Sequence, residues 1–183
     1  MFFSRLLQLI PAFFSLILRF GVICLVMGLL CFAIGEKMPR KNFDYRAFPY
    51  ATYAWEKNGD VYLKLKINRW KDKVPDMSRY IPHTFRKKLN VMRSPEHIEG
   101  LIRETCVAEL VHMVLIVLSP IFLVLLPKGW NWVCMLLYDL FGNLPFILIQ
   151  RYNRPRLVIL LERQRELQAL KAAKRMRACG AAT

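Results

Sequence analysis

The chain has 183 residues, of which 55% are hydrophobic, with a mean hydropathy of +0.26 and a formal net charge of +15. A soluble core does not need such long apolar runs, and nucleic-acid binding would explain the charge but not the runs. We therefore expect apolar spans in a lipid bilayer, basic segments that attract anionic lipid headgroups, and no nucleic-acid partner.

Cysteine and histidine positions argue against a disulfide framework and against a metal site. The five cysteines are scattered, lie mostly in apolar runs and form no Cys-x-x-Cys pair, so we expect them to be reduced packing residues. The histidines, His83, His97 and His112, are far apart and lack metal-ligand spacing.

Residues 2–34 are almost entirely apolar and are interrupted by Arg5, Pro11 and Arg19. The run is too long for one simple span. We expect an interfacial or bent helix to about Leu18, then a transmembrane helix over residues 20–34, which is one or two helices in all. A cleaved signal peptide is the alternative, since Cys31-Phe32-Ala33 ends in small residues.

Residues 35–94 form a polar insert. Residues 50–55 and 61–68 resemble two strands joined by a tight turn at residues 57–60, and Asn58-Gly59 between such runs is a strong hairpin signal. In this β-hairpin, the second strand would turn Val61, Leu63, Leu65 and Ile67 inward and Lys64 and Lys66 outward. After it, Trp70 and Lys71 suit either a membrane-interface anchor or a ligand contact.

The next element begins with Ser94-Pro95-Glu96, which combines a hydroxyl cap, a proline at the first helical position and an acid in the first turn. The helix should continue into the bilayer to about Ser119-Pro120 or Leu126. One face carries apolar residues at its start and then Glu109 and His112, so both of these should face protein.

Pro127-Lys128-Gly129 is a very short connection to a second span over residues 130–149, which predicts an antiparallel helical hairpin. Asp139, Asn143 and Pro145 lie within this span. Polar groups at membrane depth usually face a cavity, while a helix kink satisfied by Asn143 is the structural alternative.

The stretch 150–157 places three arginines, two amides and a tyrosine at the end of the span. Pro155 should break the helix there and leave a rigid polar segment, whose guanidinium groups suit carboxylate or phosphate. Anchoring by positive charge alone is the alternative. Residues 157–177 then read as an amphipathic basic helix along the membrane surface.

Lys and Arg are distributed unevenly: residues 36–104 hold sixteen and residues 151–183 hold nine, against Lys128 alone in the hairpin turn. The positive-inside rule places the insert and the tail in the cytoplasm. The prediction is a mainly α integral membrane protein of the cell membrane. It is one multi-pass domain with N-terminal segment 1–34, β-hairpin insert 35–94, transmembrane hairpin 95–150 and basic end 151–183.

The candidate chemistry lies at Glu109 and His112, which are three residues apart on a helix and therefore neighbours at roughly 5–6 Å between Cβ atoms. A carboxylate that orients an imidazole is an arrangement that activates a hydroxyl. The alternative is a buried pair that only pins helix packing. Serine-hydrolase elbow, P-loop, dinucleotide-binding and His-x4-Asp motifs are all missing.

Several motifs over residues 35–166 resemble the glycosyl-4,4'-diaponeurosporenoate acyltransferases of staphyloxanthin-type carotenoid pathways. They are Gly35-x-x-x-Pro39, Trp55-Glu56-Lys57-x-Gly59, Trp70-Lys71-x-Lys73, Glu104-Thr105-x-x-Ala108-Glu109-Leu110-x-His112, and Asn143-x-Pro145 leading into Gln150-Arg151-Tyr152-Asn153-Arg154-Pro155-Arg156-Leu157. The last two blocks are long and unusual, so the signal is specific.

The resemblance implies transfer of a fatty acyl group to the primary hydroxyl of a glucose on a carotenoid acid. The partners would be membrane lipids, a fatty acyl thioester as co-substrate and a glycosylated lipid acceptor, without a cofactor or metal. His112 would deprotonate the sugar hydroxyl and Glu109 would orient or charge-balance it. The substrate-binding candidates are Asn143 and Gln150 for the sugar or the thioester carbonyl, Arg151, Arg154 and Arg156 for phosphates or the donor's anionic end, and Asn153, Trp70 and Lys71.

Two other functions remain open from the sequence. A membrane scaffold or anionic-lipid-binding protein would need the cations but not Glu109 or His112. A methyl- or glycosyl-transferase is the third possibility, although no nucleotide-binding glycine loop supports it.

Overall fold

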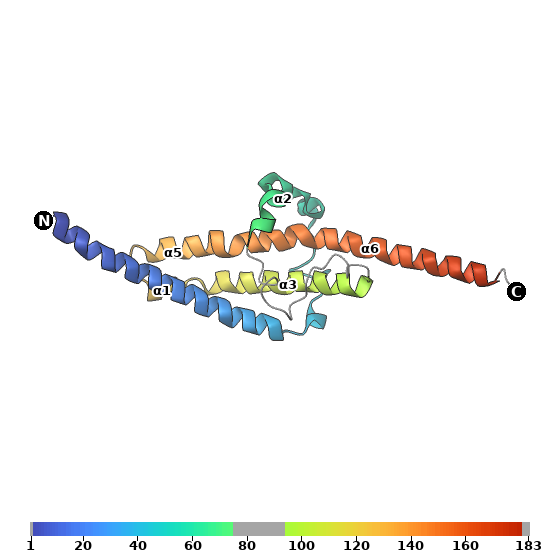
Figure 1. The fold of residues 1–183 in the computed structure, drawn as a ribbon, viewed down its shortest axis with the longest axis horizontal. Helices are drawn as coiled ribbons and strands as arrows, with labels where there is room; N and C mark the ends of the chain where they lie inside the picture. The colour runs from blue at the N-terminus through green and yellow to red at the C-terminus, as the bar shows by residue number, and fades with distance from the viewer. Residues whose placement is uncertain (1, 75–93, 181–183) are drawn as a thin grey trace. The chain divides into compact units, whose positions relative to one another are not determined.

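The computed structural model describes residues 2–74 and 94–180, so His83 lies outside the described residues. The described part is mainly helical and contains no strand (Figure 1). In chain order the elements are α1 (Phe2–Lys37), 3₁₀ helices η1 (Arg40–Asn42) and η2 (Ala54–Leu65), α2 (Ile67–Trp70), 3₁₀ helix η3 (Lys71–Lys73), α3 (Pro95–Leu118), α4 (Ile121–Leu125), α5 (Asn131–Leu137), π-helix η5 (Tyr138–Asn143) and α6 (Leu144–Gly180).

The chain forms two compact units. The first unit contains Met1–Met38 and Val107–Ile147, and the second contains Pro39–Cys106 and Leu148–Thr183. Each unit has its own apolar core.

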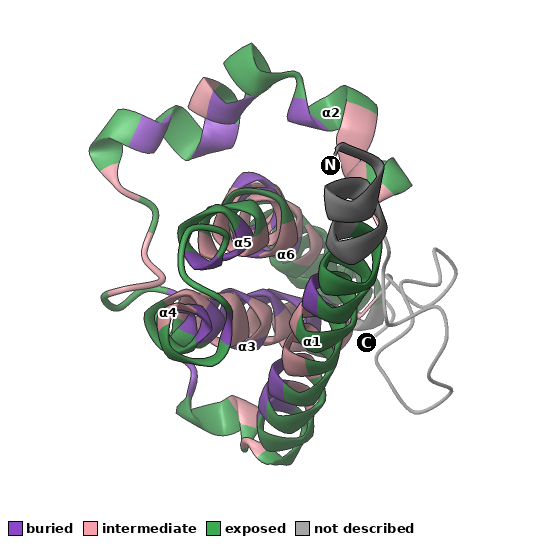
Figure 2. Ribbon diagram, turned by 90° about the vertical axis from the view of Figure 1, so that its left-hand side faces the viewer, coloured by how far each residue is buried: buried purple, intermediate pink, exposed green. Residues whose placement is uncertain are grey.

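Within the described residues, three helical segments are long and apolar enough to cross a membrane: Ile10–Lys37, Pro95–Leu125 and Asn131–Ala178. Much of α1 is exposed (Figure 2), and many of its exposed residues are apolar. Such a surface is costly in water and suits lipid. Of the one or two helices expected over the N-terminal run, the structure has one, since α1 continues through Pro11 and past Leu18.

The core of the first unit joins α1 to the hairpin. Buried Met27 and Cys31 from α1 pack in one cluster with Phe122, Leu126 and Cys134. The Phe20 and Phe122 rings lie 5.3 Å apart. The described cysteines Cys24, Cys31, Cys106 and Cys134 are free thiols, in agreement with their prediction as reduced packing residues.

The predicted antiparallel hairpin is confirmed by polar contacts whose partners run in opposite directions along the chain. The Asn131 side-chain amide donates to the carbonyl of Leu123 (3.1 Å), and Ser119 Oγ donates to Asp139 Oδ2 (2.8 Å). The helix end predicted near Ser119-Pro120 is also observed, since α3 ends at Leu118 and α4 begins at Ile121.

The start of α3 agrees with its sequence signature, because the backbone N–H of His97 donates to Ser94 Oγ (3.2 Å) and the helix begins at Pro95. A serine cap satisfies one of the otherwise unpaired N–H groups of the first turn.

The predicted β-hairpin insert is wrong. The turn is present, with left-handed backbone at Lys57, Asn58 and Gly59, but 3₁₀ turns flank it. The side chains also do not alternate as predicted. Tyr62 is buried, whereas Leu63 and Leu65, which were expected to face inward, are 41% and 53% exposed. Tyr62 turns inward because its hydroxyl donates to the buried carboxylate of Glu56. A tertiary polar contact therefore overrides the alternation in the sequence.

The predicted helix break at Pro155 is also wrong, because α6 continues through it. Proline has no N–H to donate to the carbonyl of Arg151 four residues earlier. Beside this turn of α6, Gly59 lies close to the Arg151 and Tyr152 carbonyls, and Arg156 Nη1 donates to the Tyr152 carbonyl (2.7 Å). The tail is helical as predicted; its placement on a membrane stays a prediction.

Candidate active site

In the first unit the π-helix η5 brings Asn143 against His112 of α3. His112 Nδ1 and Asn143 Oδ1 are 3.0 Å apart, and the Phe146 ring stacks on the imidazole with centroids 4.5 Å apart and planes 10° from parallel. Asn143 is buried, whereas His112 is half-buried. The imidazole is therefore held in position by two partners while part of it stays accessible.

Hydrogen-bond chemistry fixes the proton arrangement of this pair. Asn143 Nδ2 donates to the carbonyl of Tyr138 (3.1 Å), which can only accept, so the amide oxygen must face His112. An amide oxygen also only accepts, so Nδ1 of His112 carries the proton. The lone pair of the neutral imidazole then lies on Nε2, which is the atom that can act as a base.

The π turn explains how Asn143 reaches this position. Such a turn widens the helix by one residue and leaves carbonyls without their usual partner, and here the Asn143 side chain satisfies the Tyr138 carbonyl. The structural alternative is therefore supported in part, since the helix is irregular here and Asn143 bonds one of its carbonyls. The same amide also orients His112.

Glu109 lies one helical turn before His112 on α3 and is 1% exposed. A carboxylate this deeply buried must be paired or neutral. The orienting contact on Nδ1 of His112 comes from Asn143, a residue expected to hold substrate. The proposed orienting or charge-balancing role of Glu109 stays a prediction.

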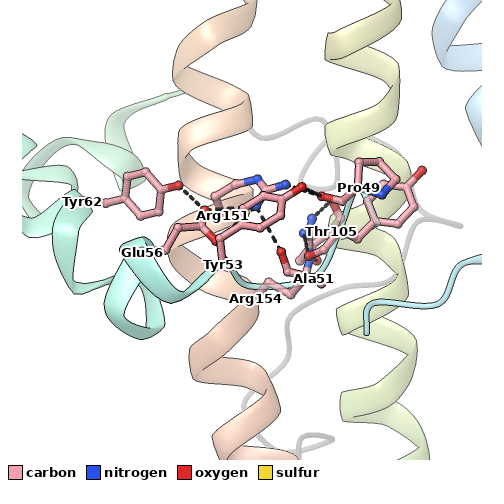
Figure 3. A network of polar contacts seen from close by, with 9 residues as sticks. Pro49, Ala51, Tyr53, Glu56, Tyr62, Thr105, Arg151 and Arg154 are labelled. Carbon is pink, nitrogen blue, oxygen red and sulfur yellow. Dashed lines mark hydrogen bonds and ion pairs between the residues drawn. The ribbon is translucent and has the colours of Figure 1, made fainter. Parts of the chain in front are cut away.

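In the second unit a buried network surrounds Glu56 (Figure 3). Arg151 Nη1 lies 3.0 and 3.2 Å from the two carboxylate oxygens of Glu56, which is 1% exposed. The same carboxylate accepts from the Tyr62 hydroxyl and from the Tyr53 backbone N–H (2.7 Å). Arg151 also donates to the carbonyls of Pro49 and Ala51.

Arg154 is more deeply buried than Arg151, with 2% of its surface exposed. Its Nε donates to Thr105 Oγ1 (2.9 Å), Nη2 to the Thr105 carbonyl (3.1 Å) and Nη1 to the Tyr50 carbonyl (2.7 Å). The Arg154 guanidinium group therefore connects α6 to α3 and to the segment before η2 (Figure 3). Ligand binding by Arg154 would require these contacts to open.

Arg156 is the third predicted arginine, and it lies at the surface of the second unit. It donates to the Tyr152 carbonyl, pairs with Asp60 (3.0 Å) and stacks over the Tyr152 ring at 3.8 Å. A Cβ on Gly59 would lie 2.8 Å from its Nη1. The three arginines thus hold the insert onto α6.

The remaining predicted substrate residues lie in the second unit and are partly accessible. Gln150 and Asn153 are half-buried and their side chains bond to no other residue that the structure describes. Trp70 Nε1 donates to the Leu65 carbonyl (3.0 Å), and Lys71 pairs with Asp72 (3.1 Å). Gln150 and Asn153 therefore keep polar groups that can meet a ligand.

Sequence reasoning missed the buried partners Glu56, Tyr62 and Thr105 as members of polar networks. The signal was present in part, because Glu56 and Thr105 fall within the quoted motifs. Their partners are 95 and 49 residues away, so spacing alone could not pair them. Within residues 2–74 and 94–180, no group of three or more His, Cys, Asp or Glu side chains is placed to hold a metal ion.

Known proteins match the chain over the stretch that carries these networks. A sequence model of the glycosyl-4,4'-diaponeurosporenoate acyltransferase family matches residues 45–163. Proteins with that name from Staphylococcus aureus strains N315, USA300 and Newman are each 31% identical over 131 residues, which is 70% of this chain and 77% of each relative. No solved structure matches. The chain therefore belongs to the glycosyl-4,4'-diaponeurosporenoate acyltransferase family and is an acyltransferase.

Proposed function

We propose that the protein esterifies a fatty acyl group onto a sugar hydroxyl of a membrane glycolipid. The proposed acceptor is a glycosylated carotenoid acid, the compound class that the names of its relatives give. The observation that carries this proposal is the fixed His112–Asn143 pair, because it leaves one basic nitrogen on a partly accessible imidazole.

The reaction follows from the tautomer of His112. Nε2 accepts the proton of the sugar hydroxyl as the hydroxyl oxygen attacks the thioester carbonyl. The new C–O bond forms, the C–S bond breaks, and the proton passes from Nε2 to the departing thiolate. The products are the glycolipid ester and a free thiol, and no metal or redox cofactor enters the balance.

Other residues have supporting roles in this proposal. Glu109 balances the positive charge that develops on His112 when it holds the proton. Contact of Gln150, Asn153, Trp70 and Lys71 with substrate stays a prediction from the sequence. Arg151 and Arg154 hold the insert in place through their contacts with Glu56 and Thr105.

We assign the insert and the tail to the cytoplasmic side of the cell membrane, since they carry nearly all of the positive charge outside the apolar spans. Cysteine introduced in place of Lys64 should react with an impermeant thiol reagent only after the cytoplasmic face is opened. Cysteine in place of Lys128 should react in intact cells. The reverse pattern would overturn the assignment.

Mass spectrometry of lipid and pigment extracts tests the activity in cells that make the wild-type protein, His112→Gln or Asn143→Leu. We expect His112→Gln to lower acyl transfer by about 10²–10⁴-fold, the usual contribution of a general base. Asn143→Leu should also lower it, because the proton is no longer fixed on Nδ1. The glycosylated acceptor should accumulate in both.

His97→Gln in the second unit is the matched control, since it makes the same change at a histidine that the mechanism does not use. Activities are compared at equal amounts of protein in the membrane. Full transfer by His112→Gln would overturn its role as the base. No difference in any acylated glycolipid between cells with and without the wild-type protein would overturn the proposed acceptor class.

A further inference from the structure

The second unit contains a polar cleft of about 360 Å³ that the predicted site does not use. This volume lies within the range of small-molecule sites, roughly 300–1,000 Å³. Its polar lining consists of four cations and two carboxylates, namely Lys41, Arg46, Arg103, Arg165, Asp44 and Glu99. The cleft therefore has an excess of two positive charges.

The ion pairs in the cleft show which cations carry this excess. Glu99 accepts from Arg103 (2.7 Å) and from Arg165 (2.7 Å) and so compensates part of their charge. Asp44 Oδ1 accepts from the backbone N–H of Arg46 (2.9 Å), which does not involve the guanidinium. Among the described residues, no carboxylate forms an ion pair with Lys41 or Arg46.

The floor of the cleft restricts the kind of anion that fits. Phe43 and Tyr45 line it and are buried, and the Arg46 guanidinium lies 5.4 Å from the centroid of the Tyr45 ring. An arginine stacked over a ring is preorganised for a planar, bidentate contact to phosphate or carboxylate. By contrast, Arg151 and Arg154 already donate to protein groups.

We propose that this cleft binds the phosphate of a phosphopantetheine thioester, and that Lys41 and Arg46 are its principal ligands. The choice of this ligand rests on the proposed function, which requires an acyl thioester donor. Both coenzyme A and the prosthetic arm of an acyl-carrier protein contain this phosphate. The cleft binds this shared phosphate group.

Titration calorimetry on the purified full-length protein in zwitterionic lipid nanodiscs tests the proposal with three probes: pantetheine, 4'-phosphopantetheine and coenzyme A. Phosphopantetheine should bind at least about tenfold more tightly than pantetheine, since a charge-assisted hydrogen bond contributes at least a factor of about ten. The double variant Lys41→Gln/Arg46→Gln should lose that advantage. Lys64→Gln/Arg69→Gln removes the same charge from exposed positions of the same unit and should change affinity by less than about twofold.

The probes also separate the two sources of the phosphate. Equal affinity for phosphopantetheine and coenzyme A supports a carrier-protein arm, and tighter binding of coenzyme A supports a nucleotide-bearing donor. Equal binding of pantetheine and phosphopantetheine would overturn the proposal, and so would equal losses in the two double variants. Binding of phosphatidylglycerol vesicles without binding of any probe would reassign the cleft to lipid headgroups.

Failure of this inference is distinguishable from failure of the proposed function. Unchanged probe affinity in Lys41→Gln/Arg46→Gln, together with normal acyl transfer by the wild-type protein, would overturn the cleft alone. Normal phosphopantetheine binding without any acyl transfer by the wild-type protein would overturn the function alone. His112→Gln should lose transfer while keeping probe affinity.

Discussion

Neutralising Glu56 should destabilise the second unit more than any change to a surface ion pair. The variant is Glu56→Gln, which keeps the side-chain volume and removes the charge opposite Arg151. Glu56 is 1% exposed in the wild type, and its carboxylate also accepts hydrogen bonds from the Tyr62 hydroxyl and the Tyr53 N–H. The glutamine amide can no longer satisfy all three donors.

The magnitude follows from the burial of the pair. Removing one partner of a buried ion pair costs about 3–5 kcal/mol, because the other charge is left uncompensated. Arg151 keeps the carbonyls of Pro49 and Ala51, so we expect the lower end, about 3 kcal/mol. For a chain of this size that corresponds to a decrease in melting temperature of roughly 6–12 °C.

Thermal unfolding in detergent micelles measures this loss, with a thiol-reactive dye that reports exposure of buried Cys106. Asp60→Asn is the control, because its pair with Arg156 is mostly exposed and should contribute at most about 1 kcal/mol. The double variant Glu56→Gln/Arg151→Met should lose less than the sum of the single changes. The reasoning fails if Glu56→Gln melts no lower than Asp60→Asn.

Two further changes test the packing of each unit. Gly59→Ala should lower the free energy of unfolding by about 1–3 kcal/mol, because φ is +86° and the new Cβ would lie 3.2 Å from the Tyr152 carbonyl oxygen. Gly28→Ala is its control in the same melting assay, since a Cβ at Gly28 would have nothing within 4 Å. Ser119→Ala should cost about 1–3 kcal/mol by removing the donor to Asp139, and Ser119→Thr should restore most of it. A melting temperature equal to that of the wild type in either alanine variant would contradict the corresponding contact.

Local signals in the sequence were sufficient where the interaction is local. The cap at Ser94, the helix end near Pro120 and the short turn after Leu126 each depend on a few neighbouring residues, and the structure contains all three. The hydropathy pattern likewise indicated apolar spans in the N-terminal segment and in the hairpin, because length and composition alone decide whether a helix can cross a bilayer.

Two errors came from rules that tertiary contacts override. Pro155 breaks an isolated helix, but here α6 continues through it, packed against the insert at Gly59 and Asp60. The alternation after Gly59 favoured a strand, but inward rotation of Tyr62 satisfies Glu56. Neither arrangement is visible from sequence spacing.

The candidate site shows the same division. The sequence determined that His112 and Glu109 lie together on one apolar helix, since helical spacing fixes that relation. The tertiary structure decided which group orients His112, because the π turn at Tyr138–Asn143 adds a residue to the helix and carries Asn143 to Nδ1. It also decided that the guanidinium groups of Arg151 and Arg154 donate to Glu56 and Thr105, because a buried guanidinium group is stable only where the fold places hydrogen-bond acceptors beside it.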